Sequence, residues 1–267
     1  MLAWPFLETR LDLAAARAAQ ADGRILVLAG ILFAAAPASS GLLWAAAITR
    51  SGGRITCLDA CARFGVGSLV NSVAPAHLGG AVRATLLLQP VAGAGRRRVL
   101  ECLGTVQVAR LTALGALVAT AAWPWLAPVA VAAVAVAALL ARRTAGARLV
   151  LLAQLPLVAR LAAATTVLWA LGLPTPVRFA LVAVAALELA ATVPISPGNL
   201  GVASAAAAVA LGAAGVAGSD GLTAGIVLHG LETVAGVSFG TASAATFAVL
   251  RLRRRSAVAP APLPAAA

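Results

Sequence analysis

Two apolar stretches of this chain, one in each half, are interrupted in their middles by proline and glycine. The first interruption falls in residues 71–83 and the second in residues 192–204. A backbone broken at membrane depth leaves N–H and C=O groups that lipid cannot pair. Such breaks survive only where protein or a wet cavity covers them, and a matched pair in two halves points to a transport site. The pattern therefore predicts a membrane transporter.

The composition indicates an integral membrane protein with no separate catalytic domain. Hydrophobic residues make up 62% of the 267 residues and charged residues only 10%, against about 25% charged residues in soluble domains. The apolar segments recur along the whole length, so a signal peptide does not explain them. All 20 basic residues are arginines, and the short arginine runs lie between apolar spans. This placement is typical of loops facing anionic headgroups, and we expect no nucleic-acid partner.

The chain divides into three parts. Residues 1–24 mix charged residues with Leu and Ala at helical spacing, which predicts an interfacial amphipathic segment. Residues 25–250 are expected to form one transmembrane domain, and residues 251–267 a basic, Pro/Ala-rich, disordered cytoplasmic tail. The expected apolar segments are residues 25–48, 64–88 with the first break, 99–122, 125–141, 149–171, 179–216 with the second break, and 222–250.

The arginine runs predict the orientation. Residues 96–98, 142–148 and 251–255 are all expected on the cytoplasmic side, because cytoplasmic loops carry the excess of basic residues. The arginine-containing loop 50–63 joins them only if residues 64–88 form a re-entrant hairpin. A second re-entrant hairpin would then enter from the other side, which gives an inverted repeat. Two ordinary spans across residues 179–216 would leave the C-terminus cytoplasmic as well, so charge leaves that alternative open.

We therefore expect an all-α, polytopic membrane helix bundle with two Pro/Gly-broken re-entrant hairpins in an inverted repeat. Its location would be the cell membrane, multi-pass, with a cytoplasmic C-terminus. The Ala- and Arg-rich, Tyr-free composition indicates a GC-rich, bacterial source.

Three motifs occur along the chain in a recognisable order and spacing. They are carried by Asn71, Pro75, Ala76, His77, Gly79, Gly80 and Arg83, by Arg110 and Leu111, and by Pro194, Ser196, Pro197, Gly198, Asn199, Gly201 and Ser204. Over residues 44–250 this set resembles the membrane region of lysylphosphatidylglycerol synthases, a flippase-like family found fused to a synthase domain or free-standing. The resemblance implies a free-standing member that moves lipid.

The motifs depart from the family pattern in one direction. Positions that are acidic in the family appear here as Gly80, Ala109, Ala113 and Ser204. If those carboxylates handle a cationic headgroup or protons, this chain lacks that apparatus. Lysyl-phosphatidylglycerol is therefore not the expected cargo, and any lipid-modifying activity would belong to another chain.

Each break precedes a fresh apolar half-helix, whose N-terminus presents unpaired N–H groups and about half a positive charge. Aimed at the interior, such an end attracts phosphate, and the guanidinium of Arg83 adds a cation whose fork fits phosphate. The residues expected to bind a lipid phosphate are His77, Gly79, Gly80, Arg83, Pro197, Gly198, Asn199 and Gly201.

Further polar residues at membrane depth are expected to support this site: Asn71, Arg110, Glu188, Ser196, Ser204 and Glu232. An arginine at the bilayer centre costs about 2.5–3.5 kcal/mol or more, so it should have a partner. Structural alternatives stay open. In these alternatives, Arg83 would extend to the membrane interface or pair with Glu101 or Glu188. The glutamates would pair with an interior arginine, and His77 would cap a broken helix.

No catalytic or cofactor-binding arrangement emerges from the sequence. The chain has two histidines, scattered acids and no nucleophile–base spacing. Cys57 and Cys61 share a helix face, but two thiols without further ligands make a poor metal site. We expect no enzyme, no cofactor and no metal.

Two functions are compatible with this reading. The first is a flippase-like transporter of an anionic or polyprenyl-phosphate-linked lipid, with membrane lipids as its partners. The second is a non-transporting membrane partner or regulator of a lipid- or glycan-modifying enzyme, which the neutralised acidic positions favour.

Overall fold

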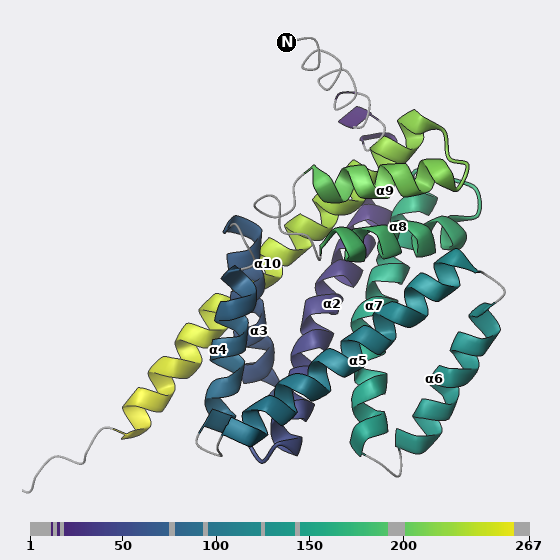
Figure 1. Ribbon diagram of the computed structural model, residues 1–267. Helices are drawn as coiled ribbons and strands as arrows, with labels where there is room; N and C mark the ends of the chain where they lie inside the picture. Colours follow the sequence, from purple (N-terminus) through teal and green to yellow (C-terminus); the bar gives the residue numbers. More distant parts are fainter. Residues whose placement is uncertain are drawn as a thin grey trace, which may run out of the picture.

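The computed structural model describes Asp12 and residues 15–16, 19–74, 78–92, 96–123, 126–141, 145–191 and 201–258, and every regular element in these ranges is helical (Figure 1). The all-helical prediction is confirmed. The longer helices are α2 (Gly23–Arg50), α5 (Arg96–Ala122), α7 (Ala145–Ala170) and α10 (Gly218–Val258). The shorter ones are α3 (Cys57–Val73), α4 (Leu78–Ala92), α6 (Ala127–Ala141), α8 (Pro176–Ala190) and α9 (Val202–Ala213).

Among the described helices, four are long and apolar enough to cross a bilayer. The qualifying stretches are Gly23–Arg50, Leu100–Ala122, Gly146–Ala170 and Gly218–Arg253. Each exceeds the roughly 20 residues that a hydrocarbon core requires. These lengths and compositions are compatible with a multi-pass membrane protein.

Local sequence signals set several helix ends. The Asp22 carboxylate accepts a hydrogen bond from the backbone N–H of Arg24 at 2.8 Å and caps α2. Thr56 caps α3 by accepting from the N–H of Asp59 at 3.2 Å. Both are the short polar acceptors that helix N-termini prefer. Gly172, with φ of 72°, follows α7 in the left-handed conformation that only glycine adopts without strain.

Both predicted interruptions separate two helices. The first lies between α3 and α4 and the second between α8 and α9. In each case the two helices pack side by side and antiparallel. Gly67 of α3 lies against Gly79 and Arg83 of α4, and Leu187 of α8 clusters with two alanines of α9.

Helix α3 begins earlier than predicted, so Arg63 lies within this helix and not in the loop before it. The residue was expected in a cytoplasmic loop, but it is buried within α3. Its Nε donates to Asp59 at 3.0 Å, and its Nη1 donates to the carbonyl of Leu86 at 2.6 Å and to Oε1 of Gln89 at 3.1 Å. The loop assignment of Arg63 is therefore wrong, because partners on α3 and α4 compensate its charge inside the bundle.

The centre of the bundle is built by close helix contacts. α2 and α7 lie side by side in the middle, and α10 crosses α2, α3 and α9 (Figure 1). Where α3 meets α10, a Cβ on Gly65 would come within 2.1 Å of Ser243 Oγ. A Cβ on Gly240 would come within 2.7 Å of Leu69 Cβ. Small residues at such crossings let the backbones approach closely.

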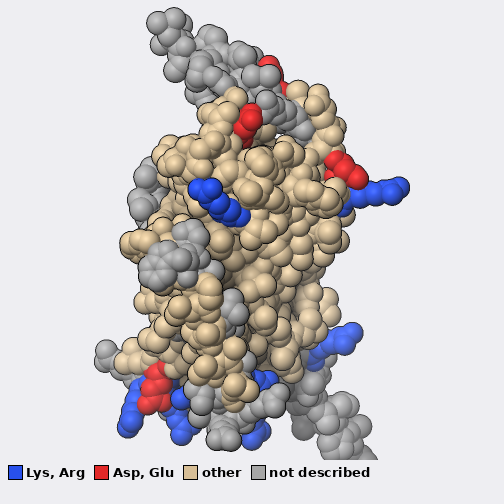
Figure 2. Space-filling model, turned by 90° about the vertical axis from the view of Figure 1, so that its right-hand side faces the viewer, with Lys and Arg blue, Asp and Glu red and all other residues tan. Residues whose placement is uncertain are grey.

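Charges gather at the two ends of the bundle, with a largely uncharged belt between them on the face seen in Figure 2. One end carries the junctions α2–α3, α4–α5 and α6–α7 and the end of α10 (Figure 1). Its exposed arginines are Arg50, Arg54, Arg97, Arg98, Arg148, Arg251 and Arg253. The other end carries the starts of α2, α8 and α10, with Asp22, Arg24, Arg178 and Asp220. Among the described residues, exposed arginines therefore lie mainly at one end.

The predicted boundaries of the two terminal segments remain to be compared with the structure. α10 continues through the arginine run to Val258, so the disordered tail predicted from residue 251 is wrong for residues 251–258. Residues 259–267 lie outside the described residues, as does most of the predicted interfacial segment 1–24.

Candidate functional site

The residues flanking both breaks line one cavity of about 640 Å³. Ala74 and Gly80 reach it from the first break, and Ala191 and Ala203 from the second. Further described lining residues come from α2, α3, α4, α5, α7, α8 and α10. The expectation that the two breaks meet at a shared site thus has a geometric counterpart in the described residues.

Ionisable side chains from five helices line this cavity. They are Arg83 of α4, Arg110 of α5, Arg160 of α7, Glu188 of α8, and His229 and Glu232 of α10. Three arginines face two glutamates, so the described lining carries a net formal charge of +1 with His229 neutral. A cavity of about 670 Å³ near the start of α8 has only Arg178 as an ionisable residue in its described lining. The charged cavity is therefore the candidate site.

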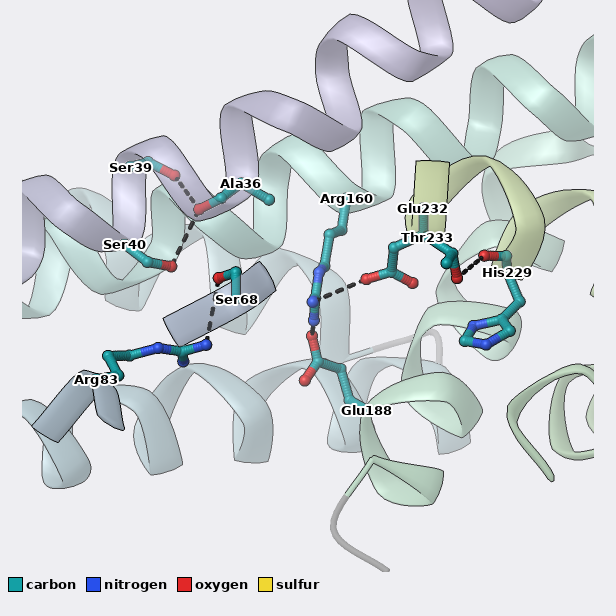
Figure 3. A network of polar contacts seen from close by, with 10 residues as sticks. All are labelled: Ala36, Ser39, Ser40, Ser68, Arg83, Arg160, Glu188, His229, Glu232 and Thr233. Carbon is teal, nitrogen blue, oxygen red and sulfur yellow. Dashed lines mark hydrogen bonds and ion pairs between the residues drawn. The ribbon is translucent and has the colours of Figure 1, made fainter. Parts of the chain in front are cut away.

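Arg160 joins three helices through ion pairs (Figure 3). Its Nη1 pairs with Oε1 of Glu188, and its Nη2 lies 2.8 Å from Oε1 of Glu232. The three side chains are 34%, 20% and 24% exposed. The open alternative in which the two glutamates pair with an interior arginine is the arrangement found, but the arginine is one that the sequence analysis did not single out. An arginine in the middle of the apolar segment 149–171 was the signal that could have found it.

The side chain of Arg83, on α4, lies against one face of α3. Its Cζ is 4.0 Å from the centroid of the Phe64 ring, and its Nη2 donates to Ser68 Oγ at 3.2 Å (Figure 3). Gly67 leaves room for the stem, since a Cβ there would come within 2.5 Å of Arg83 Cβ. Positions 64, 67 and 68 share a helix face. α3 therefore holds the guanidinium through a cation–π contact and one hydrogen bond.

Arg83 has no carboxylate partner among the described residues. The two acids considered for it pair elsewhere, since Glu101 pairs with Arg97 at 2.9 Å on the surface and Glu188 pairs with Arg160. Arg83 Nε is buried without a hydrogen-bond partner in the described part of the chain. The nearby charges that act on Arg83 are those of Arg110 and Arg160, both of like sign. The pairings of Arg83 with Glu101 or Glu188 are therefore not found.

Arg110 is the second arginine of the cavity without an ion pair to a described residue. Glu188 acts on it electrostatically from a longer range, and Arg160 opposes it. Since Glu188 is already shared with Arg160, two guanidinium groups remain without a carboxylate of their own. The cavity can accept an anion without first breaking a described ion pair.

The two glycines after the first break have different surroundings. A Cβ on Gly79 would come within 2.1 Å of the Gly67 carbonyl oxygen and 2.4 Å of Asn71 Oδ1. Gly80 lines the cavity, and a Cβ there would meet no described atom within 4 Å. Gly79 thus allows α3 and α4 to pack closely, whereas Gly80 leaves the wall of the cavity open. Asn71 lines the same cavity, with its Oδ1 buried and unpaired among the described residues.

The second break is described only at its edges. Gly201 has φ of 88° and precedes α9. The Ser204 carbonyl abuts Gly225, where a Cβ would come within 2.4 Å of it, so Ser204 lies at the contact between α9 and α10. The expected site residues that lie outside the described residues are His77, Ser196, Pro197, Gly198 and Asn199.

The described residues form a helical bundle with four helices of membrane-spanning length and a cavity whose described lining has a net positive charge. No group of three or more His, Cys, Asp or Glu side chains suited to a metal ion occurs in the described ranges. Cys61 Sγ instead donates to the carbonyl of Ala38 at 3.3 Å. Comparison with protein-family models, with curated proteins and with solved structures finds no match to this chain.

Proposed function

We propose that this chain is a flippase-like transporter that binds the anionic headgroup of a membrane lipid in the charged cavity and moves it across the cell membrane. The observation that carries the proposal is the pair Arg83 and Arg110, which line the cavity without carboxylate partners in the described part of the chain. Unpaired guanidinium groups at membrane depth are costly, and a phosphate satisfies them with charge-assisted hydrogen bonds.

The motif resemblance to the membrane region of lysylphosphatidylglycerol synthases agrees with this function. The half-helix starts at Gly80 and Ala203 both line the cavity, and helix N-termini favour anions. The function requires no cofactor and no catalytic group.

We further propose that α3–α4 and α8–α9 are re-entrant hairpins. Their helices have 17, 15, 15 and 12 residues. At 1.5 Å per residue these helices measure about 18–26 Å, which is less than the roughly 30 Å of a hydrocarbon core. Each hairpin would therefore enter and leave on the same side.

An inverted repeat accounts for the order and the contacts of the helices. α2 and α7 each contain an internal proline, Pro37 and Pro156, and both prolines line the cavity. Each of these helices is followed by a hairpin and then by a long helix. α10 packs against α3 as α5 packs against α8, and α2 packs against α7 at the centre. Such exchanged contacts are expected of two halves related by a pseudo-two-fold axis.

The arginine-rich end is assigned to the cytoplasm, in a bacterial cell membrane. The exposed arginines at the ends of α2 and α10 and at the starts of α5 and α7 support this orientation, because cytoplasmic loops carry excess arginine. The first hairpin would then open from the cytoplasm and the second from the opposite side.

The test is translocation of a fluorescent lipid by the purified protein in proteoliposomes. Vesicles with NBD-labelled phosphatidylglycerol are treated with dithionite, which bleaches only the outer leaflet, and the rate at which inner-leaflet label becomes bleachable is measured. We expect Arg83→Ala to slow this rate at least about tenfold. Arg83→Lys should rescue partly, because the charge remains but the planar fork is lost.

Arg97→Ala is the matched control, because Arg97 is 92% exposed and lies outside the cavity. Equal rates for Arg83→Ala and wild type would overturn the proposed role of the site. Binding of the lipid without any translocation, together with co-purification of a lipid- or glycan-modifying enzyme, would favour the non-transporting partner instead.

A further inference from the structure

The cavity is lined by both positive and negative side chains, and their net charge affects which charge state of a phosphate group it binds. Arg83 and Arg110 have no carboxylate of their own in the described ranges, whereas Arg160 has two. The surplus negative charge acts on Arg110, since Glu188 also interacts electrostatically with that arginine. A ligand phosphate beside Arg110 would therefore meet the field of the Arg160–Glu188–Glu232 cluster, whose formal charge is −1.

We infer that the cavity selects a singly charged phosphodiester headgroup over a doubly charged phosphomonoester, and that Glu188 and Glu232 set this selectivity. This inference rests on the proposed function and narrows its substrate class. One negative charge neutralises the described lining, which has a formal charge of +1. A second charge would be buried close to the glutamates, where like charges repel more strongly than in water.

The selectivity can be tested without disrupting the fold, because the Arg160–Glu188–Glu232 cluster contains two ion pairs. Because Arg160 is paired with both glutamates, replacing one of them by glutamine leaves the other ion pair in place. Each such variant raises the formal charge of the described lining from +1 to +2 while it keeps the side-chain shape. A dianion should then become the better match.

The experiment compares two lipids that differ by one methyl group. Dioleoyl phosphatidylmethanol is a phosphodiester with one charge, and dioleoyl phosphatidic acid is a phosphomonoester. The second ionisation of a phosphomonoester lies near pH 6, so at pH 7.5 the second lipid carries nearly two charges. Each is titrated, in detergent, as a competitor of NBD-labelled phosphatidylglycerol bound to the purified protein.

At pH 7.5 we expect the wild-type protein to bind phosphatidylmethanol about tenfold more tightly than phosphatidic acid, a difference of about 1.4 kcal/mol. Glu188→Gln and Glu232→Gln should each remove this preference. Glu101→Gln should keep it, because Glu101 lies on the surface with Arg97. At pH 5.5 phosphatidic acid is mainly a monoanion, and the wild-type preference should disappear.

Lowering the pH also acts on the protein, so its ionisable groups matter. Those that face the cluster are Arg83 on α4, Arg110 on α5 and His229 on α10, while the described lining from α2, α3 and α9 contributes none. Phosphatidylmethanol keeps its charge between pH 5.5 and 7.5, so any change in its binding over this range reports on the protein and not on the ligand. The comparison between the two lipids isolates the charge of the ligand.

The outcomes separate the two levels of the proposal. Equal affinity of the two lipids at pH 7.5, tighter binding of phosphatidic acid, or an unchanged preference in both glutamine variants would overturn the selectivity. If the labelled phosphatidylglycerol does not bind the wild-type protein at all, the proposed function itself fails.

Discussion

Nη2 of Arg160 lies 2.8 Å from Oε1 of Glu232, and the same guanidinium pairs with Glu188, so one cation on α7 serves carboxylates on α8 and α10. The ion pairs tie the helix that precedes the second break to the long C-terminal helix. They also decide the electrostatics of the cavity. Since both glutamates are engaged by Arg160, Arg83 and Arg110 are the groups left for a ligand.

Arg160→Met should destabilise the fold. It leaves two carboxylates in the bundle without their cation, and breaking such a pair costs roughly 3 kcal/mol, at the lower end for partly exposed groups. We expect a clear drop in the apparent Tm of the detergent-solubilised protein. The triple variant Arg160→Met, Glu188→Gln, Glu232→Gln should recover most of the loss, because no uncompensated charge remains.

Arg97→Ala provides the surface control for that measurement. Its pair with Glu101 is largely exposed, and such pairs contribute about 0–1 kcal/mol. A Tm for Arg160→Met equal to that of Arg97→Ala would show that the three-helix ion pair does not stabilise the bundle.

Gly79→Ala and Gly80→Ala should differ sharply although the residues are neighbours. At Gly79 the new methyl group would overlap the Gly67 carbonyl oxygen and Asn71, and overpacking of this kind costs about 1–3 kcal/mol. At Gly80 it would meet open space, where alanine stabilises a helix by up to about 1 kcal/mol over glycine. Thermal unfolding of both variants makes the comparison, and a lower Tm for Gly80→Ala than for Gly79→Ala would contradict the α3–α4 contact.

Much of the architecture followed from elementary rules applied to the sequence. Apolar runs of sufficient length predicted α2, α5, α7 and α10, because a bilayer sets the length of a spanning helix. Proline and glycine in the middle of an apolar stretch predicted the two interruptions, which separate α3 from α4 and α8 from α9. These features depend on neighbours in the sequence, which is why they could be predicted.

Long-range pairing is what the sequence could not supply. The sequence pattern predicted Arg63 in a basic loop, yet its partners Leu86 and Gln89 lie on the following helix. Arg160 stands in an apolar segment, and the acids that hold it come from two later helices. Gly79 and Gly80 are neighbours in the sequence, and the approach of α3 to Gly79 alone gives them different surroundings. These contacts between distant residues decide which arginines have a carboxylate partner and which do not.

Gly65→Ala should weaken the crossing of α3 and α10. The added methyl group would lie 2.1 Å from Ser243 Oγ and 2.3 Å from Ser243 Cβ, so the helices would have to separate. We expect a loss of about 1–3 kcal/mol, followed as a decrease in Tm. Adding Ser243→Gly removes these two atoms and leaves Phe239 Cε1, which lies 2.9 Å from the added Cβ. It should therefore restore part of the loss, apart from the cost of a glycine within a helix.

Gly230→Ala is the control for this pair, because a Cβ at Gly230 would meet no described atom within 4 Å. It lies on α10 as Ser243 does and should leave the Tm unchanged or slightly higher. Additive effects of Gly65→Ala and Ser243→Gly, with no recovery in the double variant, would mean that the two positions do not meet.

The orientation can be tested with a cysteine that the chain already has. Cys57 is exposed at the start of α3, beside the arginine-rich end of the bundle. If that end faces the cytoplasm, as the excess of arginine predicts, a membrane-impermeant maleimide should label Cys57 only after the cells are permeabilised. In a Cys57→Ser background, Arg178→Cys should be labelled in intact cells, because exposed Arg178 lies at the opposite end.

Cys102 is buried and Cys61 is only partly exposed, so the Cys57→Ser protein without Arg178→Cys measures the background. Labelling of Cys57 in intact cells together with protection of the residue 178 cysteine would reverse the assigned orientation, and with it the side from which each hairpin opens.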